Sequence, residues 1–391
     1  MSKVKITHIA RFAHPHIGGI ESVINQINES LPNEEFEKEV FCCSNTDKSS
    51  IENGVKYNRC RYLFDFAANS ISPQLFFRMM FLKTDIIHFH MPVIQNVVIW
   101  FILYHLGLLR YKKMFITYHS DVVGYDRIMK PFVPLYRYFL SKADKIHVLS
   151  PNIIESSNML SAVKNKCVVI PQGISISDKA NVEKVNEIRQ KYATKKIIFS
   201  LGRFVKYKGF IYGIKAMKNI KDAVYLIGGN GPLKSEFEDY IVENDLQDKV
   251  ILLGRIENYD LASYYKACDI YLFPSIMQSE AFGIVQLEAM TYSKPVINTH
   301  LGTGVNYVSL DKETGLTVEP ENVEQLTDAI NELLNNDELR LQYGRNARER
   351  VEKMFEIKKI QQQIMVFMSL VKINKCVKNK YLNFLKKNMI L

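Results

Sequence analysis

The sequence predicts an α/β protein of two domains, each built on a parallel sheet covered by helices. Short runs of β-branched and aromatic residues alternate with helix-like segments through both halves of the chain, a pattern typical of such sheets. With 391 residues, the chain is too long for one ordinary domain and fits two of roughly 170 to 200 residues. Ligand-binding loops are therefore expected where the strands end.

In the first half, strands are expected at residues 4–11, 36–43, 85–90, 113–118, 145–149 and 167–170. Helices are expected from the loop at 12–21 to about residue 30, at 73–82, at 93–109 and from 151. The segment 93–109 is the most apolar of the chain, but polar residues interrupt it and it is short for a membrane span. We interpret it as a buried or membrane-facing helix.

In the second half, strands are expected at residues 197–201, 223–228, 250–253, 269–273 and 295–298, and closing helices at 323–334 and 338–351. The stretch 175–186 is polar and weakly periodic, so we place the domain boundary near Gly173. The predicted division is 1–172, 173–354 and a C-terminal segment, 355–391.

The charge and the cysteine content of the chain indicate its expected location and partners. The formal net charge is +10, and after Glu356 the chain has eight lysines and no acidic residue. With apolar residues interleaved, this tail predicts an amphipathic helix on an anionic leaflet, and the basic, aromatic stretch 127–140 fits lipid headgroups or a solvated face. No nucleic-acid-binding module accompanies the lysines. Six unpaired-looking cysteines and a start without a signal peptide favour the cytosol.

The segment 202–209, G-R-F-V-K-Y-K-G, follows a predicted strand and opens a helix. Arg203 offers a planar fork of donors and Lys208 a point charge, and the flanking glycines let the backbone approach a ligand. This pattern is typical of a diphosphate clamp. A basic surface turn is the alternative for the segment taken alone.

The segment 280–290, E-A-F-G-I-V-Q-L-E-A-M, follows the strand that Pro274 ends. A helix from about Phe282 places Glu288 in its first turns and Glu280 before its start. The amides of residues 281–283 are then free donors at the positive end of the helix dipole, which suits an anion whose hydroxyls the two carboxylates hold. An ordinary charged helix face is the alternative.

The first half of the chain contains two further candidate site features. Gly18 and Gly19 stand at a predicted helix N-terminus, where the backbone can approach a ligand; taken alone, the pair fits a purely structural turn better. His119 stands where a predicted parallel strand ends, at the edge where open α/β sheets bind ligands. It fits a residue that lines the cleft, or a buried histidine bonded to its own loop. His88 and His90 share one face of a strand, and we find no third metal ligand at a suitable spacing.

Together the segments 202–209 and 280–290 resemble the retaining nucleotide-sugar glycosyltransferases of family 4, which show a G-R-x-x-x-x-K-G segment and then an E-x7-E segment. The resemblance runs over nearly the whole chain and is strongest between residues 197 and 333. It implies the GT-B fold: two Rossmann-like domains facing across a cleft, with a last helix, for which 355–370 is the candidate, crossing back to the first domain.

The resemblance also implies roles for single residues. Glu288 would hold the ribose hydroxyls, Glu280 would contact the transferred sugar, and the turn at 228–232 would lie near the donor. The loop at 301–304 departs from the family's commoner pattern, so no sugar-selecting role is assigned to it. The implied catalytic residues are His119 and Glu280, and the implied donor-binding residues are Gly18, Gly19, Arg203, Lys208, Arg255, Ile256, Ala281, Phe282, Gly283, Ile284 and Glu288.

By resemblance, transfer proceeds by front-face attack, and no cofactor is expected. Clamp charges can substitute for a metal ion and no D-x-D occurs, so metal-independent transfer is expected. The implied partners are a nucleotide-diphosphate sugar, with GDP-mannose slightly preferred over UDP-hexoses or dTDP-rhamnose, and a lipid-linked saccharide acceptor for O-antigen or capsule at the cytoplasmic face of the plasma membrane. A nucleotide-sugar epimerase and a non-catalytic membrane-bound scaffold remain the alternative functions.

Overall fold

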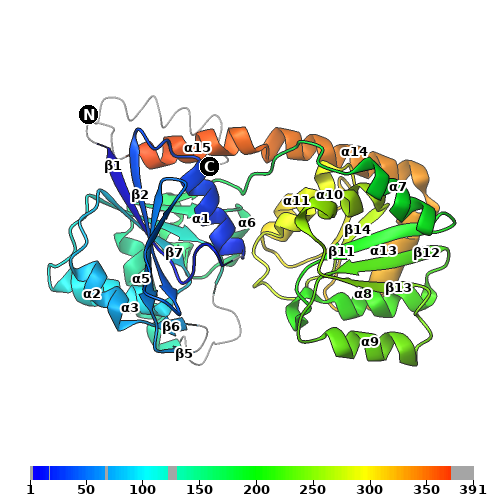
Figure 1. Cartoon of the computed structure of the whole chain (residues 1–391), viewed down its shortest axis with the longest axis horizontal. Coiled ribbons are helices and arrows are strands. Elements are labelled where there is room, and N and C mark those ends of the chain that lie inside the picture. The colour runs from blue at the N-terminus through cyan, green and yellow to red at the C-terminus, as the bar shows by residue number, and fades with distance from the viewer. Residues whose placement is uncertain (1–2, 17, 67–68, 122–129, 371–391) are drawn as a thin grey trace. The chain divides into compact units, whose positions relative to one another are not determined.

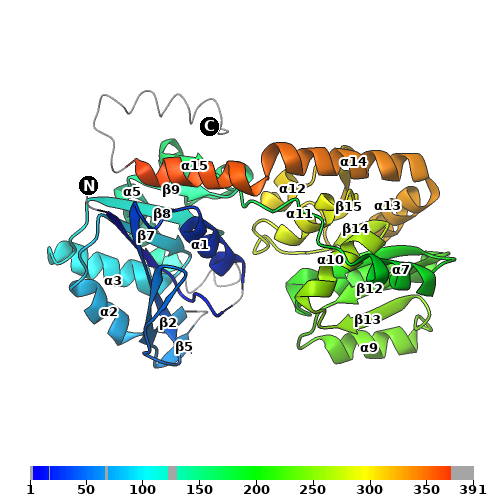
Figure 2. The ribbon, with the colours of Figure 1, turned by 45° about the horizontal axis from the view of Figure 1, so that its top comes forward.

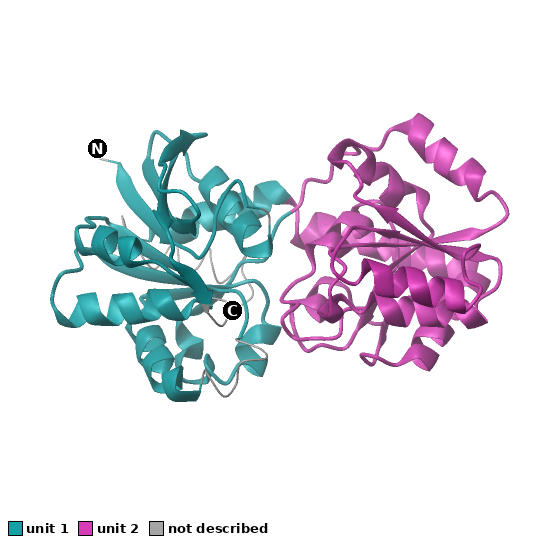
Figure 3. Cartoon of the chain, turned by 60° about the horizontal axis from the view of Figure 1, so that its bottom comes forward, with its two compact units in different colours: residues 1–173, 357–391 teal, residues 174–356 magenta. Residues whose placement is uncertain are grey.

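The computed structural model describes residues 3–16, 18–66, 69–121 and 130–370, and it divides the chain into two units (Figures 1 and 3). Unit 1 comprises residues 1–173 together with 357–391, and unit 2 comprises residues 174–356. The predicted boundaries lie after residues 172 and 354. The lysine-rich end of the chain lies outside the described residues, as does the start of the basic stretch at 127–140.

Unit 1 contains an eight-stranded sheet in the order β10-β9-β8-β7-β1-β2-β4-β3. The strands are β1 (Val4–Ile9), β2 (Phe36–Ser44), β3 (Ser50–Glu52), β4 (Val55–Arg61), β7 (Ile86–Met91), β8 (Lys113–Tyr118), β9 (Lys145–Val148) and β10 (Cys167–Val169). Every neighbouring pair is parallel except β3 with β4. A short antiparallel pair, β5 (Phe64–Phe66) and β6 (Asn69–Ile71), stands apart from it.

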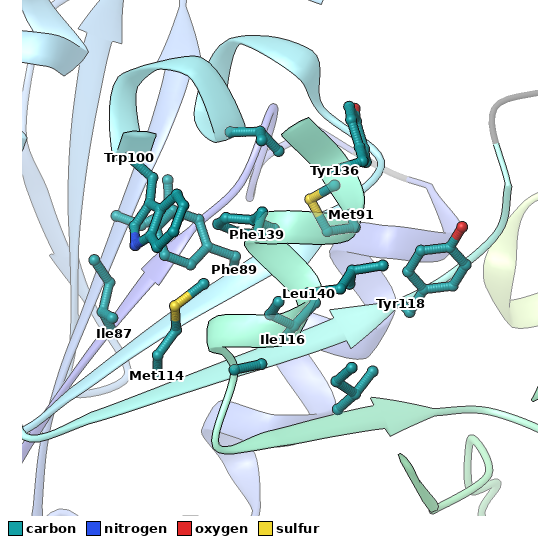
Figure 4. Packing of buried hydrophobic residues seen from close by; sticks show 14 of the residues in the cluster. Ile87, Phe89, Met91, Trp100, Met114, Ile116, Tyr118, Tyr136, Phe139 and Leu140 are labelled. Carbon is teal, nitrogen blue, oxygen red and sulfur yellow. The ribbon is translucent and has the colours of Figure 1, made fainter. Parts of the chain in front are cut away.

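The α-helices described in unit 1 are α1 (Gly19–Glu29), α2 (Pro73–Met80), α3 (Ile94–His105), α5 (Val133–Lys142), α6 (Asn152–Ser156) and α15 (Ile357–Ser369). Strand residues alternate between the two faces of the sheet. On one face Trp100 of α3 and Phe139 of α5 pack with ring centroids 4.8 Å apart, and Phe139 meets Phe89 of β7 at 5.1 Å (Figure 4). On the other face Phe367 of α15 packs on Phe115 of β8.

Unit 2 contains a six-stranded, wholly parallel sheet in the order β13-β12-β11-β14-β15-β16. The strands are β11 (Lys196–Leu201), β12 (Ala223–Gly228), β13 (Val250–Gly254), β14 (Ile270–Phe273), β15 (Val296–Thr299) and β16 (Gly315–Val318). β14 is buried throughout, which explains its nearly continuous apolar sequence. β11 and β14 are neighbours although about seventy residues separate them, because the chain crosses over twice on one side before it returns.

Helices cover both faces of this second sheet (Figure 2). Those described are α7 (Val182–Lys191), α8 (Phe210–Ala216), α9 (Lys234–Glu243), α10 (Asn258–Ala267), α11 (Ile284–Thr291), α12 (Gly304–Val308), α13 (Val323–Asn335) and α14 (Asp337–Met354). Helix α8 contacts α9 and α13, whereas α10 contacts α7 and α11. Among the described residues no helix combines the length and apolarity needed to cross a membrane.

Candidate functional site

Backbone hydrogen bonds tie together the loops that follow β11, β12 and β14 in unit 2. The amide of Phe204 donates to the carbonyl of Asn230 at 2.9 Å, and the amide of Ile276 donates to the carbonyl of Tyr207 at 2.8 Å. Because the three strands are parallel neighbours, their carboxyl ends bring these loops to one edge of the sheet, where open α/β sheets bind ligands.

Gly209 explains why the first of these loops ends in glycine. Its φ is +66°, and a Cβ atom at this position would lie 1.9 Å from the carbonyl oxygen of Pro274. A side chain would therefore push the loop after β11 away from the loop after β14. Glycine removes that conflict and tolerates the left-handed conformation, so Lys208 is held next to the segment that carries Glu280.

Lys208 and Glu280 form an ion pair in this loop cluster. The distance from Lys208 Nζ to Glu280 Oε2 is 2.5 Å, and the two side chains are 14% and 12% exposed. Ser275 Oγ donates to the same carboxylate oxygen at 3.3 Å, and Lys208 Nζ lies 5.4 Å from the ring centroid of Phe273. The sequence places both residues at strand ends, and the structure shows that they contact each other directly.

Arg203 and Arg255 are exposed at the same edge of the sheet. In the described part of the chain, neither side chain has a hydrogen bond or an ion pair. Ile256 is partly buried and packs over Gly228, where a Cβ atom would lie 2.5 Å from Ile256 Cδ1. The two guanidinium groups are thus available to an anion, while Ile256 serves as part of the wall beside β12.

The start of α11 offers free backbone donors. The helix begins at Ile284 rather than near Phe282, because Gly283 takes a left-handed conformation with φ +73° and caps it. Within the described residues, the amides of Ala281, Phe282 and Gly283 donate no hydrogen bond. Unpaired amides at a helix N-terminus attract anions through their N–H groups and the helix dipole.

Glu288 lies one turn inside α11 and faces two buried tyrosines. Tyr265 Oη donates to Glu288 Oε2 at 2.5 Å, and Tyr265 and Tyr271 are 1% and 0% exposed. Burial raises the pKa of the Glu288 carboxyl above its ordinary value of 4.5, and the hydrogen bond from Tyr265 opposes that rise. An ionised Glu288 therefore carries an energetically costly charge.

Replacing Glu288 by glutamine is expected to raise the free energy of unfolding of unit 2. A carboxyl with a raised pKa binds its proton more readily in the native state, so the wild type loses stability as the pH rises above 4.5. The amide has no such charge and still accepts from Tyr265. In thermal unfolding, the difference in melting temperature between the variant and the wild type should grow with pH. The exposed Glu243→Gln is the control, and an advantage independent of pH would contradict this account.

In unit 1 the glycine pair begins α1. Gly18 has an extended backbone, and a Cβ atom there would lie 2.4 Å from Oε2 at the end of the Glu21 side chain. His16 Nδ1 lies 3.2 Å from Glu21 Oε1. Gly19 has open space where its Cβ would stand. Gly18, His16 and Glu21 border a hollow of about 360 Å³ whose lining also includes Gln26 and Gln172.

Five histidines of unit 1 lie buried on one face of the sheet: His8, His88, His90, His119 and His147. They form two chains of contacts across neighbouring strands. Burial lowers the pKa of His8 and His119 to about 3 and that of His147 to about 4. The imidazoles are therefore neutral at pH 7, so each ring has one N–H and one free electron pair.

One of these chains has fixed proton positions. His147 Nε2 lies 2.7 Å from the carbonyl oxygen of Ile170, so it must donate. His147 Nδ1 then accepts from Thr117 Oγ1 at 3.1 Å, and Thr117 accepts from His88 Nε2 at 2.8 Å. Among the described residues His88 Nδ1 has no hydrogen-bond partner, so it is left as a free electron pair. His147 and His88 are therefore both Nε2–H tautomers.

The prediction that His88 and His90 have no third metal ligand was wrong in geometric terms. His8, on the neighbouring strand β1, brings a ring nitrogen within 4.8 Å of one from each of them. Its register explains the proximity, since His8 pairs with His88 across the parallel strands β1 and β7. Spacing within one strand could not show this, because the third residue lies eighty positions upstream.

The structure brings only some of the sequence-derived residues together. Lys208 contacts Glu280, whereas Glu288 contacts Tyr265 rather than Glu280. His119, Gly18 and Gly19 belong to unit 1 and the other candidates to unit 2. Within unit 1 the amide of His119 donates to the carbonyl of Met91 at 3.2 Å.

Sequence reasoning missed several supporting residues. Thr303 Oγ1 donates to the carbonyl of Glu280 at 2.8 Å. The loop at 301–304, whose sequence departs from the family's commoner pattern, therefore supports the segment 280–290. Ser275 and Tyr265 each bond one of the two carboxylates. Only Ser275 had a usable signal, since it stands between the end of β14 and Glu280. The other two come from segments whose position depends on the folded sheet.

Comparisons with known proteins match both units. The family model described as Glycosyltransferase Family 4 matches residues 17–178, and the model described as Glycosyl transferases group 1 matches residues 181–350. O-antigen chain mannosyltransferase C of Escherichia coli is 32% identical, over 90% of this chain and 94% of that protein. D-rhamnosyltransferase WbpZ of Pseudomonas aeruginosa is 29% identical, over 87% and 88%.

Solved structures show the same fold. Sucrose-phosphate synthase from Thermosynechococcus elongatus aligns with a TM-score of 0.76 at 24% identity, covering 93% of this chain and 97% of that one. HepE from Anabaena, in complex with UDP, aligns with a TM-score of 0.75 at 16% identity, covering 94% and 100%. The two parallel-sheet units are the Rossmann-like domains of the GT-B fold, and the chain belongs to the glycosyltransferases of family 4.

Proposed function

We propose that the protein is a retaining hexosyltransferase that moves a sugar, with mannose as the first candidate, from a nucleotide-diphosphate donor to a lipid-linked or oligosaccharide acceptor. The product would be a cell-surface polysaccharide such as an O-antigen or a capsule. The names of two relatives support this direction, since one is an O-antigen chain mannosyltransferase and the other a D-rhamnosyltransferase.

One observation carries the proposal: the Lys208–Glu280 pair lies at the strand edge where the amides of residues 281–283 donate no hydrogen bond to any described residue. An ammonium group has three donors, so Lys208 can keep Glu280 and also donate to a phosphate oxygen. The free amides and the exposed Arg203 add further donors for an anion. A diphosphate fits this combination better than a neutral ligand does.

These groups would act on the departing phosphate. As the bond between the sugar and the diphosphate breaks, negative charge develops on the leaving oxygen, and fixed cations and amide dipoles stabilise it there. The departing phosphate would accept the acceptor's proton, with attack on the same face. Glu280 would bind a sugar hydroxyl, and Glu288 the ribose hydroxyls. We propose that this charge set lets transfer proceed without a metal ion.

The acceptor and its location are part of the same proposal. The sequence contains a lysine-rich C-terminal segment without acidic residues, which suits attraction to an anionic leaflet. We propose that the enzyme works at the cytoplasmic face of the plasma membrane on a lipid-linked saccharide, and that it does not bind nucleic acid.

A panel of nucleotide sugars tests the proposal directly. The purified protein is incubated with GDP-mannose, UDP-hexoses and dTDP-rhamnose, with and without a chelator. Slow hydrolysis of one donor, unchanged by the chelator, is the expected result, because water can replace an absent acceptor. Epimerisation of a donor would instead indicate an epimerase, and no turnover or binding of any donor would indicate a scaffold; either outcome contradicts the proposal.

A further inference from the structure

Three histidines of unit 1 lie in a line that ends at the strand edge. His8 Nδ1 is 3.0 Å from His90 Nε2, and His90 Nδ1 is 3.2 Å from His119 Nε2. They come from β1, from β7 and from the residue after β8, which are neighbours in the sheet. His8 and His90 are fully buried, and His119 is 5% exposed. The line thus runs from the interior to the carboxyl edge of the strands.

Shared protons couple the three rings. A neutral imidazole has one N–H and one electron pair, so each contact between two rings needs one donor and one acceptor. Once one ring has a given tautomer, the other two must follow it. The Nε2 atom of His119 is committed to His90, and Nδ1 is the ring nitrogen left for a ligand. Burial keeps the charged forms unfavourable along the line.

We propose that His90, with His8 behind it, is a positioning residue that holds His119 in one tautomer and one orientation, so that Nδ1 of His119 stays available to a sugar at the carboxyl edge of this sheet. Contact of His119 with a sugar is what the resemblance to family 4 implies, and it rests on the proposed function. Buried partners that fix the tautomer and the ring orientation of a functional histidine are a general means of preorganising a site. Without the contact to His90, the ring of His119 could rotate about its side-chain bonds.

A metal ion is the rival occupant, because His8, His88 and His90 each bring a ring nitrogen within 4.8 Å of the others. Two observations favour shared protons. The positive charge of Lys38 acts on His8, which opposes a nearby cation. The cluster itself has no carboxylate to offset the cost of burying a dication. One equivalent of zinc in the purified protein would overturn the proposal.

The first test measures tautomers and needs no substrate. Nitrogen-15 NMR of histidine-labelled protein at pH 7 should show His119 as a single neutral tautomer, with His88 and His147 as internal references for Nε2–H. In His90→Leu the His119 signals should shift to a mixture of tautomers. In His90→Asn, whose amide stands near the position of Nδ1, a single tautomer should return. Trp100 fluorescence checks that the variants are folded.

The second test uses the donor found in the panel. His90→Leu should lower kcat roughly 10²-fold, the order expected for a misplaced catalytic group, with a smaller change in KM, and His90→Asn should recover part of the loss. His147→Asn is the matched control, since it alters a buried histidine that makes no hydrogen bond to His90 or His119. An unchanged His119 tautomer or an unchanged kcat in His90→Leu overturns the positioning role, whereas a wild type without turnover refutes the proposed function instead.

Discussion

Replacing Lys208 or Arg203 by alanine is expected to lower transfer by about 10³-fold or more, the effect seen when a charge that stabilises a leaving group is removed. Lys208 is held at the strand edge by Gly209 and Glu280, and Arg203 is exposed beside it without a partner among the described residues. Both cations would meet the diphosphate, where charge develops as the sugar departs. The loss should therefore appear mainly in kcat, measured with the donor that the panel identifies.

The design must separate lost catalysis from lost folding. Lys208→Ala leaves Glu280 as a carboxylate that is only 12% exposed and has lost its cation, which destabilises the loop by itself. The double variant Lys208→Ala/Glu280→Gln removes that uncompensated charge, and it should regain thermal stability without regaining activity. Lys206→Ala, an exposed lysine of the same loop, is the matched control and should keep nearly full activity. Full activity in either single variant would refute the clamp.

The alternation of apolar runs was enough to predict the sheets and most of their strands. Runs such as 270–273 are hydrophobic throughout because β14 has neighbours on both sides and helices on both faces. Parallel strands joined by helices share a carboxyl edge, so the sequence also indicated where Lys208 and Glu280 would lie. It could not show their direct contact, because loop conformations after different strands depend on close approaches such as that of Gly209 to Pro274.

The missed elements are those whose signals were short or polar. β3 and β4 form a hairpin around Asn53 and Gly54, both with positive φ. An Asn-Gly pair is a strong hairpin signal, but the strand before it, β3, is short. Helix α7 was missed because its exposed face makes the sequence polar, although Asn181 caps it by accepting from the amides of Glu183 and Lys184. β16, only four residues long, gave no periodic pattern to detect.

The histidine cluster shows a different limit of sequence reasoning. The pair His88 and His90 is visible within one strand, but His8, Thr117 and His147 come from three other strands. Their proximity depends on the strand order and register, which bring His8 beside His88 and Thr117 beside both His90 and His147. Strand order and register are properties of the whole sheet, so they cannot be predicted from the spacing of residues within one strand.

Mild acid is expected to unfold unit 1 before unit 2. All five buried histidines belong to unit 1, and burial holds their pKa values below the ordinary value of 6.5, to about 3 for His8 and His119. The unfolded chain therefore takes up protons below pH 6.5 that the native unit cannot take up, and stability falls as the pH falls. Each histidine contributes about 1 kcal/mol per pH unit across that range.

The combined slope is large compared with the stability of a typical domain, which is about 5–15 kcal/mol. Five such groups would reduce the free energy of unfolding by that amount within about two or three pH units below 6.5. Unit 2 contains a single histidine, His300, whose side chain is 64% exposed. Its acid stability should therefore follow its carboxylates and persist to lower pH.

Trp100 makes this difference measurable, because it is the only tryptophan of the chain and is fully buried in unit 1. Its fluorescence should change cooperatively near pH 4 to 5, while far-ultraviolet circular dichroism retains the helical signal of unit 2 and falls in a second step. His147→Gln removes one titrating group and should shift the fluorescence midpoint to lower pH, provided that the amide replaces the bond to Ile170. A fluorescence signal that stays native below pH 4 would mean that the histidines charge without unfolding, and that the interior around them is open to water.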